Sequence, residues 1–104
     1  GVYKMDVYLR IMNHFGYRKQ MKKLNEETYE LLESISDYEN ALASGNVEDL
    51  HMLRNHVIEE MGDTLILLTE FLCEYDIKKE ELDMIMDYKI DRTLERIDTG
   101  YYDK

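Results

Sequence analysis

The sequence predicts an all-α fold, a bundle of about four helices. Proline is absent and only five glycines occur in 104 residues, although strand-rich domains need frequent turns built from Gly, Pro and Asn. One good turn stands near the middle of the chain, at Ser44-Gly45-Asn46. Apolar residues on either side of this turn recur at helical spacing. A chain of this length suits one domain with one core, so we expect a single domain over residues 1–104.

The first two predicted helices cover about residues 2–15 and 17–43, and Gly16 separates them. The first helix is short, and three of its apolar residues can face one side: Val7, Ile11 and Phe15. The second helix carries one apolar stripe, formed by Met21, Leu24, Leu31, Ile35 and Leu42. A stripe of this kind is typical of a helix that packs one face against a core.

The third predicted helix runs from about residue 47 to residue 75, and Glu48 and Asp49 suit its positively polarised start. Its stripe consists of Leu50, Leu53, Val57, Met61, Leu65, Leu68 and Leu72. After Asp63 the helix becomes apolar on several faces, which indicates burial on more than one side. A monomer of this size can hardly supply that burial. We therefore expect a homodimer or tetramer that associates through the second and third helices.

The fourth predicted helix starts near Lys78, with Glu80 and Glu81 in its first turn, and ends near Gly100. Its apolar residues are Leu82, Ile85, Met86, Ile90, Leu94 and Ile97. Four amphipathic segments joined by short connections predict a helical bundle.

Charge and cysteine content exclude several classes of protein. The formal net charge of −10 argues against an open surface for duplex nucleic acid, where phosphates would be repelled. A nucleotide ligand remains compatible, because a bound Mg²⁺ changes the local sign of charge. Cys73 is the only cysteine, which rules out an intrachain disulfide and fits a cytoplasmic protein. The longest apolar run, residues 65–68, is far too short to span a membrane.

Two acidic pairs lie within the amphipathic segments. Glu27 and Glu30 are three residues apart on the second helix, and Glu60 and Asp63 are three apart on the third. Residues at this spacing are neighbours on one helix face, and like charges there repel each other. Two such pairs on antiparallel helices could meet as four carboxylates, which is the hard oxygen environment that Mg²⁺ and Mn²⁺ prefer.

The same pattern has a plainer interpretation. With 13 Glu and 10 Asp in the chain, short acidic motifs arise easily by chance. Glu80 and Asp83 repeat the spacing at what we interpret as a solvated helix start. Spacing alone therefore leaves both a metal site and a solvated acidic face open.

The motifs taken together resemble the MazG-like family of all-α nucleoside triphosphate pyrophosphohydrolases. Residues 20–31, QMKKLNEETYEL, resemble the family's opening Glu-Glu-x-x-Glu helix. Residues 59–65, EEMGDTL, are similar to its Glu-x-x-Asp half, including the glycine before the aspartate. Residues 88–92, YKIDR, and Arg96 look like its downstream basic segment. The resemblance covers about residues 17–102.

The resemblance implies a Mg²⁺-dependent (or Mn²⁺-dependent) hydrolase that cleaves an NTP or dNTP to the monophosphate and pyrophosphate. The implied metal ligands are Glu27, Glu30, Glu60 and Asp63. Glu26 and Glu59 would support these ligands from outside, or one of them would orient the attacking water. The implied phosphate-binding residues are Lys23, Lys89 and Arg92.

Two alternative functions stay open from the sequence. The first is phosphoribosyl-ATP pyrophosphatase of histidine synthesis, which belongs to the same fold. The second is a non-catalytic helical module whose acidic faces are merely solvated.

Overall fold

The computed structural model describes residues 2–103, which form four α-helices and a short 3₁₀ turn, Tyr101–Asp103. The helices are α1 Val2–Phe15, α2 Tyr17–Ser44, α3 Leu50–Glu74 and α4 Lys79–Asp98. The prediction of an all-α fold of about four helices is confirmed. Gly1 and Lys104, the ends of the predicted 1–104 domain, lie outside the described residues.

The turn between α2 and α3 lies where the sequence predicts it. Gly45 adopts φ 72°, a left-handed conformation that glycine enters without steric cost. The amide of Gly45 donates to the carbonyl of Leu42, and the amide of Asn46 donates to that of Ala41, so the last carbonyls of α2 are satisfied. Val47, the predicted start of the third helix, still belongs to this turn, since its amide donates to Gly45. Helix α3 therefore begins at Leu50.

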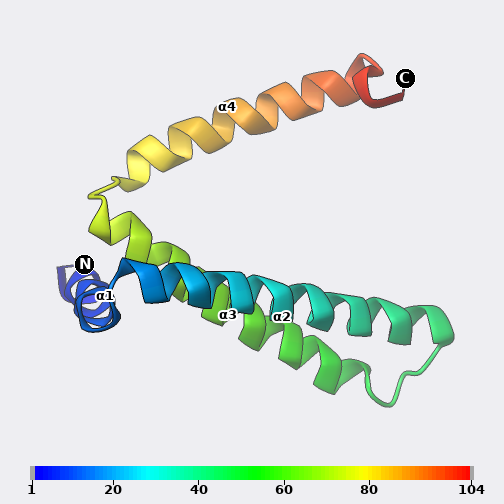
Figure 1. The fold of residues 1–104 in the computed structure, drawn as a ribbon. Coiled ribbons are helices and arrows are strands. Elements are labelled where there is room, and N and C mark those ends of the chain that lie inside the picture. The colour runs from blue at the N-terminus through cyan, green and yellow to red at the C-terminus, as the bar shows by residue number, and fades with distance from the viewer. Residues whose placement is uncertain (1, 104) are drawn as a thin grey trace.

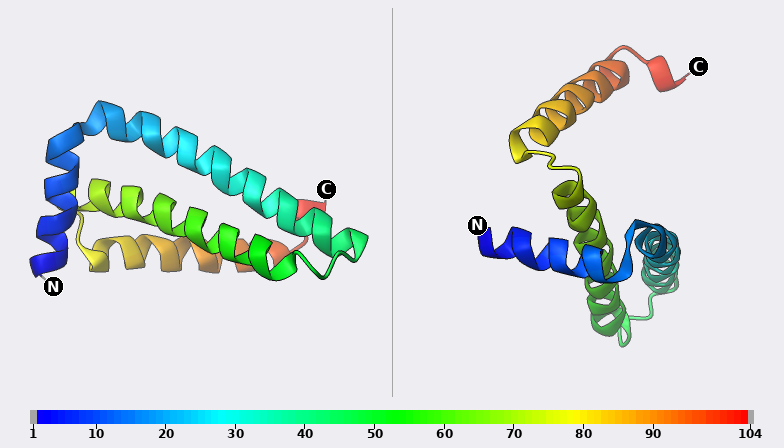
Figure 2. Two further views of the ribbon diagram at one scale, coloured as in Figure 1. Left: turned by 90° about the horizontal axis from the view of Figure 1, so that it is seen from below. Right: turned by 60° about the vertical axis from the view of Figure 1, so that its left-hand side comes forward.

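The long helices α2 and α3 run antiparallel beside each other, and α1 lies across one end of the pair (Figures 1 and 2). Gly16, with φ 84°, makes the sharp bend between α1 and α2. Met12 of α1 is 2% exposed and closes that end of the pair. This arrangement leaves one long seam between α2 and α3.

The seam between α2 and α3 is more polar than the sequence predicts. The buried residues of α2 are seven apart: Gln20, Glu27, Ser34 and Ala41. Those of α3 are Glu60, Thr64, Leu67 and Glu70. Most of the predicted stripes are only partly covered, and Met21, Leu42, Met61, Leu65 and Leu68 are exposed. The prediction that the stripe of α2 packs against the core is wrong for Met21 and Leu42, because α2 and α3 meet along the neighbouring face. The predicted burial of the α3 stripe between subunits stays a prediction.

Helix α4 stands apart from the rest of the chain. It leaves the end of α3 and runs back along the molecule (Figure 1). Its backbone does not pack against α1, α2 or α3 within the described residues, although Lys79 and Leu82 in its first turn line a pocket shared with α1 and α3. Its apolar residues Ile85, Met86, Ile90, Leu94 and Ile97 are all about half exposed. Within residues 2–103, no helix is both long and apolar enough to cross a bilayer.

Candidate metal centre

Three of the four predicted metal ligands come together across the seam. Glu27 and Glu30 from α2 and Glu60 from α3 each place a carboxylate oxygen within 4.8 Å of the other two. The i, i+3 spacing puts Glu27 and Glu30 on adjacent turns of one face, and the antiparallel pairing brings Glu60 opposite them. Among the described residues, these three form the one such cluster of His, Cys, Asp or Glu.

Two of the three clustered carboxylates are buried and lack partners, whereas Glu30 is exposed. Glu27 and Glu60 are each 8% exposed, and the Oε2 atom of each has no hydrogen-bond partner within the described chain. A buried carboxylate is costly unless it is paired or binds a metal. Three converging carboxylate oxygens also form the hard donor set that Mg²⁺ and Mn²⁺ take. These residues therefore fit a divalent cation.

The electrostatics of Glu60 reflect the same crowding. Burial raises the pKa of its carboxyl, and the nearby charges of Glu30 and Glu27 raise that pKa further. His56 opposes the shift and lowers the pKa of Glu60, whereas Asp63 adds a smaller increase. In the absence of a cation, the cluster therefore disfavours full ionisation.

Asp63, the fourth predicted ligand, lies next to the cluster rather than in it. It is exposed on α3 and contributes no atom to the group of three. It does line a cavity together with Glu27, and it is close enough to influence Glu60 electrostatically.

A lysine and a histidine border the carboxylates. The Nζ atom of Lys23 lies 3.6 Å from Oε1 of Glu27, and Nε2 of His56 lies 3.8 Å from Oε1 of Glu60. The lysine and histidine side chains are half exposed, whereas the two carboxylates are mostly buried. Lys23, a predicted phosphate-binding residue, lies beside the carboxylate cluster with its ammonium group open to solvent.

The other predicted site residues lie outside the cluster. Glu26 and Glu59 are exposed on α2 and α3, and Glu59 has His56 as a neighbour, with Nδ1 and Oε2 4.0 Å apart. Lys89 and Arg92 lie on α4, whose backbone does not pack against α2 or α3, so the described chain does not bring them to the carboxylates. The Arg92 guanidinium instead lies 5.7 Å from the ring centre of Tyr88.

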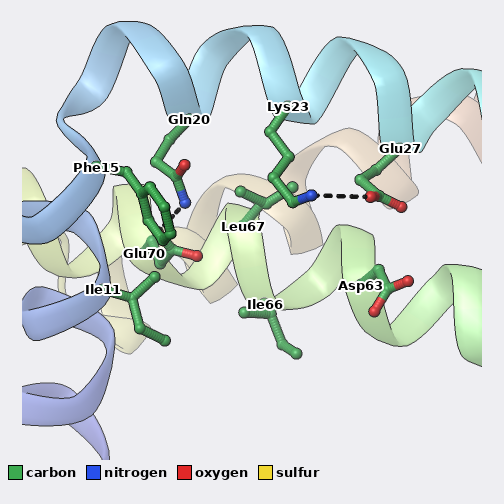
Figure 3. Close-up of a pocket in the computed structure, with 9 residues that line it drawn as sticks. All are labelled: Ile11, Phe15, Gln20, Lys23, Glu27, Asp63, Ile66, Leu67 and Glu70. Carbon is green, nitrogen blue, oxygen red and sulfur yellow. Dashed lines mark hydrogen bonds and ion pairs between the residues drawn. The ribbon is translucent and has the colours of Figure 1, made fainter.

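A cavity of about 240 Å³ continues from the metal centre toward α1 (Figure 3). Glu27 and Asp63 line one end, and Gln20 and Glu70 line the other. The amide of Gln20 donates to Oε1 of Glu70 over 2.7 Å, and Glu70 is only 1% exposed. The cavity is completed by Lys23 and by the apolar residues Ile11, Phe15, Ile66 and Leu67.

The sequence analysis missed Gln20 and Glu70 as site residues. A signal was present, since Gln20 lies seven residues before Glu27 and Glu70 seven after Asp63, two turns along the same faces. An isolated Glu after an apolar run looks like a helix surface residue, which concealed its burial.

Comparison with known proteins gives one match. The model of the MazG nucleotide pyrophosphohydrolase domain matches residues 15–99, which include all of α2, α3 and α4. No curated protein and no solved structure matches the chain. The family match covers most of the chain and contains the three clustered carboxylates. The protein therefore belongs to the MazG nucleotide pyrophosphohydrolase family, whose members are hydrolases of phosphoric anhydrides.

Proposed function

We propose that this protein is a Mg²⁺-dependent pyrophosphohydrolase of nucleoside triphosphates, in which Glu27, Glu30, Glu60 and Asp63 hold the metal. The observation that carries the proposal is the convergence of three carboxylates, two of which, Glu27 and Glu60, have a buried oxygen that lacks a partner within the described chain. Mn²⁺ has similar ligand preferences and is the natural second metal to test.

The reaction consumes one water molecule. A new P–O bond forms between water and the α-phosphorus, the bond from that phosphorus to the bridging oxygen breaks, and pyrophosphate leaves. Reactions of this type depend on positioning and charge neutralisation more than on a protein nucleophile. When bound, a divalent cation supplies Lewis acidity toward the phosphate oxygens and lowers the pKa of water.

Other side chains of the protein would neutralise the phosphate and accept the proton of the attacking water. Lys23 is placed to neutralise a phosphate oxygen at the edge of the carboxylate cluster, since its ammonium group is exposed beside Glu27. Glu26 and Glu59 flank the ligands from the solvent side, where one of them would accept the proton of the attacking water.

The outer phosphates need further positive charge, which we assign to Lys89 and Arg92 of a second copy. Beyond its first turn, helix α4 has an apolar face that is about half exposed within residues 2–103, and these two residues flank that face. A homodimer in which α4 packs on the partner would cover the apolar face and carry both cations toward the partner's carboxylates. The exposed apolar residues of α2 and α3 supply the remainder of such an interface.

The decisive experiment is pyrophosphate release from a panel of NTPs, dNTPs and phosphoribosyl-ATP, with Mg²⁺, with Mn²⁺ and with a chelator. We expect release from at least one nucleoside triphosphate, dependent on the cation. Glu60→Gln removes an ionised ligand at nearly constant volume and should lower kcat at least about a hundred-fold.

The matched control is Glu33→Gln, an exposed carboxylate on α2 outside the cluster, which should leave turnover unchanged. Release from phosphoribosyl-ATP alone would assign the enzyme of histidine synthesis instead. No release from any member of the panel would favour a non-catalytic module, and full activity of Glu60→Gln would show that the ligand set is wrong.

A further inference from the structure

The cavity beside the metal centre has a polar floor and an apolar rim. Glu70 and Gln20 are 1% and 3% exposed and form the floor, whereas Phe15 and Ile66 are 48% and 43% exposed and form the rim (Figure 3). Recognition pockets commonly combine apolar walls with a few fixed polar groups. At about 240 Å³ the cavity is smaller than the pockets that enclose drug-sized ligands, about 300–1,000 Å³, and suits a single ring system.

The hydrogen-bonding capacity of the floor is only partly used. Gln20 donates one amide hydrogen to Oε1 of Glu70, and no other hydrogen bond of either side chain occurs within the described residues. An ionised carboxylate accepts through two oxygens and donates nothing. A carboxylate buried to this degree is stabilised by each further donor it gains. The floor therefore offers mainly acceptors to a ligand.

The cavity also lies at a suitable distance from the carboxylate cluster. Seven residues separate Gln20 from Glu27 and Asp63 from Glu70, which is about 10 Å along a helix axis at about 1.5 Å per residue. This span leaves room for a sugar between a base on the floor and an α-phosphate at the metal. Phe15 presents an aromatic face at the rim, and bases stack well on such faces.

We infer that this cavity binds the nucleobase of the substrate, and that Glu70, oriented by Gln20, selects bases with an exocyclic amino group. The inference rests on the proposed function. Cytosine, adenine and guanine each bring an amino group that donates to the Glu70 carboxylate. Uracil and thymine have one ring N–H between two carbonyl oxygens, so they would bring a carbonyl acceptor against the Glu70 oxygens.

The wild-type protein provides the first test and needs no substitution. kcat and KM are measured with Mg²⁺ for dCTP, dATP, dGTP, dUTP and dTTP. We expect at least one amino-bearing substrate to exceed dUTP and dTTP about ten-fold or more in kcat/KM. The three amino-bearing substrates distinguish which base the cavity admits. Equal kcat/KM across all five would overturn the inference while leaving the proposed function in place.

The second test separates base selection from a merely structural tie between α2 and α3. Glu70→Gln keeps the shape of the side chain and can still accept from Gln20, but it replaces one acceptor oxygen by a donor group. We expect the KM of the preferred substrate to rise about ten-fold, with kcat kept and with dUTP unchanged or improved. An equal fall in kcat/KM for all five substrates would mean that Glu70 only holds the helices together.

The control is Glu74→Gln, an exposed carboxylate one turn further along α3, which should change neither preference nor KM. If Glu70→Gln does not fold, Phe15→Leu on the exposed rim takes its place. Phe15→Leu should raise KM about ten-fold for the whole panel with kcat unchanged, because stacking is lost. An unchanged KM would show that the base does not bind in this cavity.

Binding measurements keep the two proposals distinguishable. Titration calorimetry with dCMP, dAMP, dGMP and dUMP in Mg²⁺ reports base preference without any hydrolysis. If no triphosphate is hydrolysed, the proposed function fails, and a preference for an amino-bearing monophosphate would still support the cavity's role. Equal or absent binding of all four would reject it.

Discussion

At the scale of single residues, the unusual feature is charge inside a helix–helix seam. Glu27, Glu60 and Glu70 are all nearly buried, at positions where a helix pair normally places aliphatic side chains. Gln20 partners Glu70, whereas the buried oxygens of Glu27 and Glu60 lack hydrogen bonds within the described chain. The cluster therefore costs stability without a cation and should gain from one.

This cost should make the stability of the metal-free protein depend on pH. The pKa of Glu60 is raised in the folded state. As the pH rises above the ordinary pKa of Glu, Glu60 therefore loses its proton in the unfolded state before it does so in the folded state. The stabilising contribution is complete below the ordinary value, about 4.3, and is lost as the pH rises through the raised folded-state pKa. Glu60→Gln stays neutral throughout and should escape this loss.

Thermal melting with a chelator across pH checks this expectation. The midpoint of Glu60→Gln should exceed that of the wild type at about pH 8, and the difference should shrink as the pH falls toward about 4. Saturating Mg²⁺ should reverse the order at the higher pH, since the variant lacks a ligand. A gap between the two midpoints that does not change with pH would show that crowding at Glu60 carries no penalty.

Metal binding can be read from the same melts. A ligand that binds only the folded state adds about 2.7 kcal/mol at a hundred times its Kd, which raises the midpoint by several degrees. We expect Mg²⁺ to raise the wild-type midpoint and to have no such effect on Glu27→Gln. Glu33→Gln, exposed on the same helix, should respond like the wild type. An undiminished response of Glu27→Gln would exclude Glu27 as a ligand.

At the scale of elements, the ends of the helices are set by local geometry. Gly45 ends α2 in a left-handed conformation, and the amides of Gly45 and Asn46 close the last turn of that helix. The interior glycine Gly62 is a different case, because a Cβ added there would meet nothing within 4 Å in its own chain. Gly45 thus stabilises the fold, whereas Gly62 destabilises the helix in which it lies.

Replacing each glycine by alanine should separate these roles. Gly45→Ala places a Cβ in a left-handed conformation at a cost of about 1–2 kcal/mol, which lowers the midpoint by about 4–8 °C for each kcal/mol in a domain of this size. Gly62→Ala should stabilise α3 by about 0.5–1 kcal/mol. Chelator-treated protein at one fixed concentration is the sample. A lower midpoint for Gly62→Ala would show that a second copy covers this face of α3.

At the scale of the whole molecule, one chain is more open than a compact domain of its length. Its radius of gyration is 17.7 Å, against about 13 Å for a compact domain of this length. Its accessible surface is 8602 Å², against about 6,200 Å² for a compact monomer of this mass. The excess, doubled for two chains, lies within the roughly 2,000–5,000 Å² that obligate homodimers bury. A homodimer is therefore the assembly we propose.

A matched pair of methionines on α4 tests this assembly. Met86 lies on the apolar face with Leu82 and Ile90, whereas Met84 lies about 200° away around the helix. Met86→Asp places a charge in the proposed interface and should shift the sedimentation equilibrium toward monomer. Met84→Asp should not. The same sedimentation equilibrium for both variants would show that this face of α4 does not form the interface.

Shared sites would also allow two inactive variants to complement each other. Glu60→Gln damages the metal centre, and Lys89→Ala damages the proposed phosphate contact from the other copy. If α4 serves the partner's site, a heterodimer of the two contains one site with both residues intact, so an equal mixture should recover roughly a quarter of wild-type turnover. No recovery after confirmed subunit exchange would place Lys89 in the site of its own chain, and full activity of Lys89→Ala by itself would place Lys89 outside the site.

The sequence by itself determined the helices and the carboxylate pairs. Helical periodicity, the absence of proline and the glycines at 16 and 45 are local signals, and the four helices end within a few residues of the predicted limits. The spacing of Glu27 and Glu30 depends only on the helical repeat, so their shared face was predictable too. Helix limits and the face that a residue occupies depend on interactions between residues close together in the sequence, so they can be predicted from it.

The tertiary structure alone decided which faces meet. The apolar stripe of α2 predicted the core, yet the seam runs along Gln20, Glu27, Ser34 and Ala41, and the apolar stripe is only partly covered in the single chain. Burial of Glu70 depends on Gln20, fifty residues away, and on α1 closing the cavity. A side chain's surroundings are a property of its neighbours in space, and its position in the sequence does not contain them.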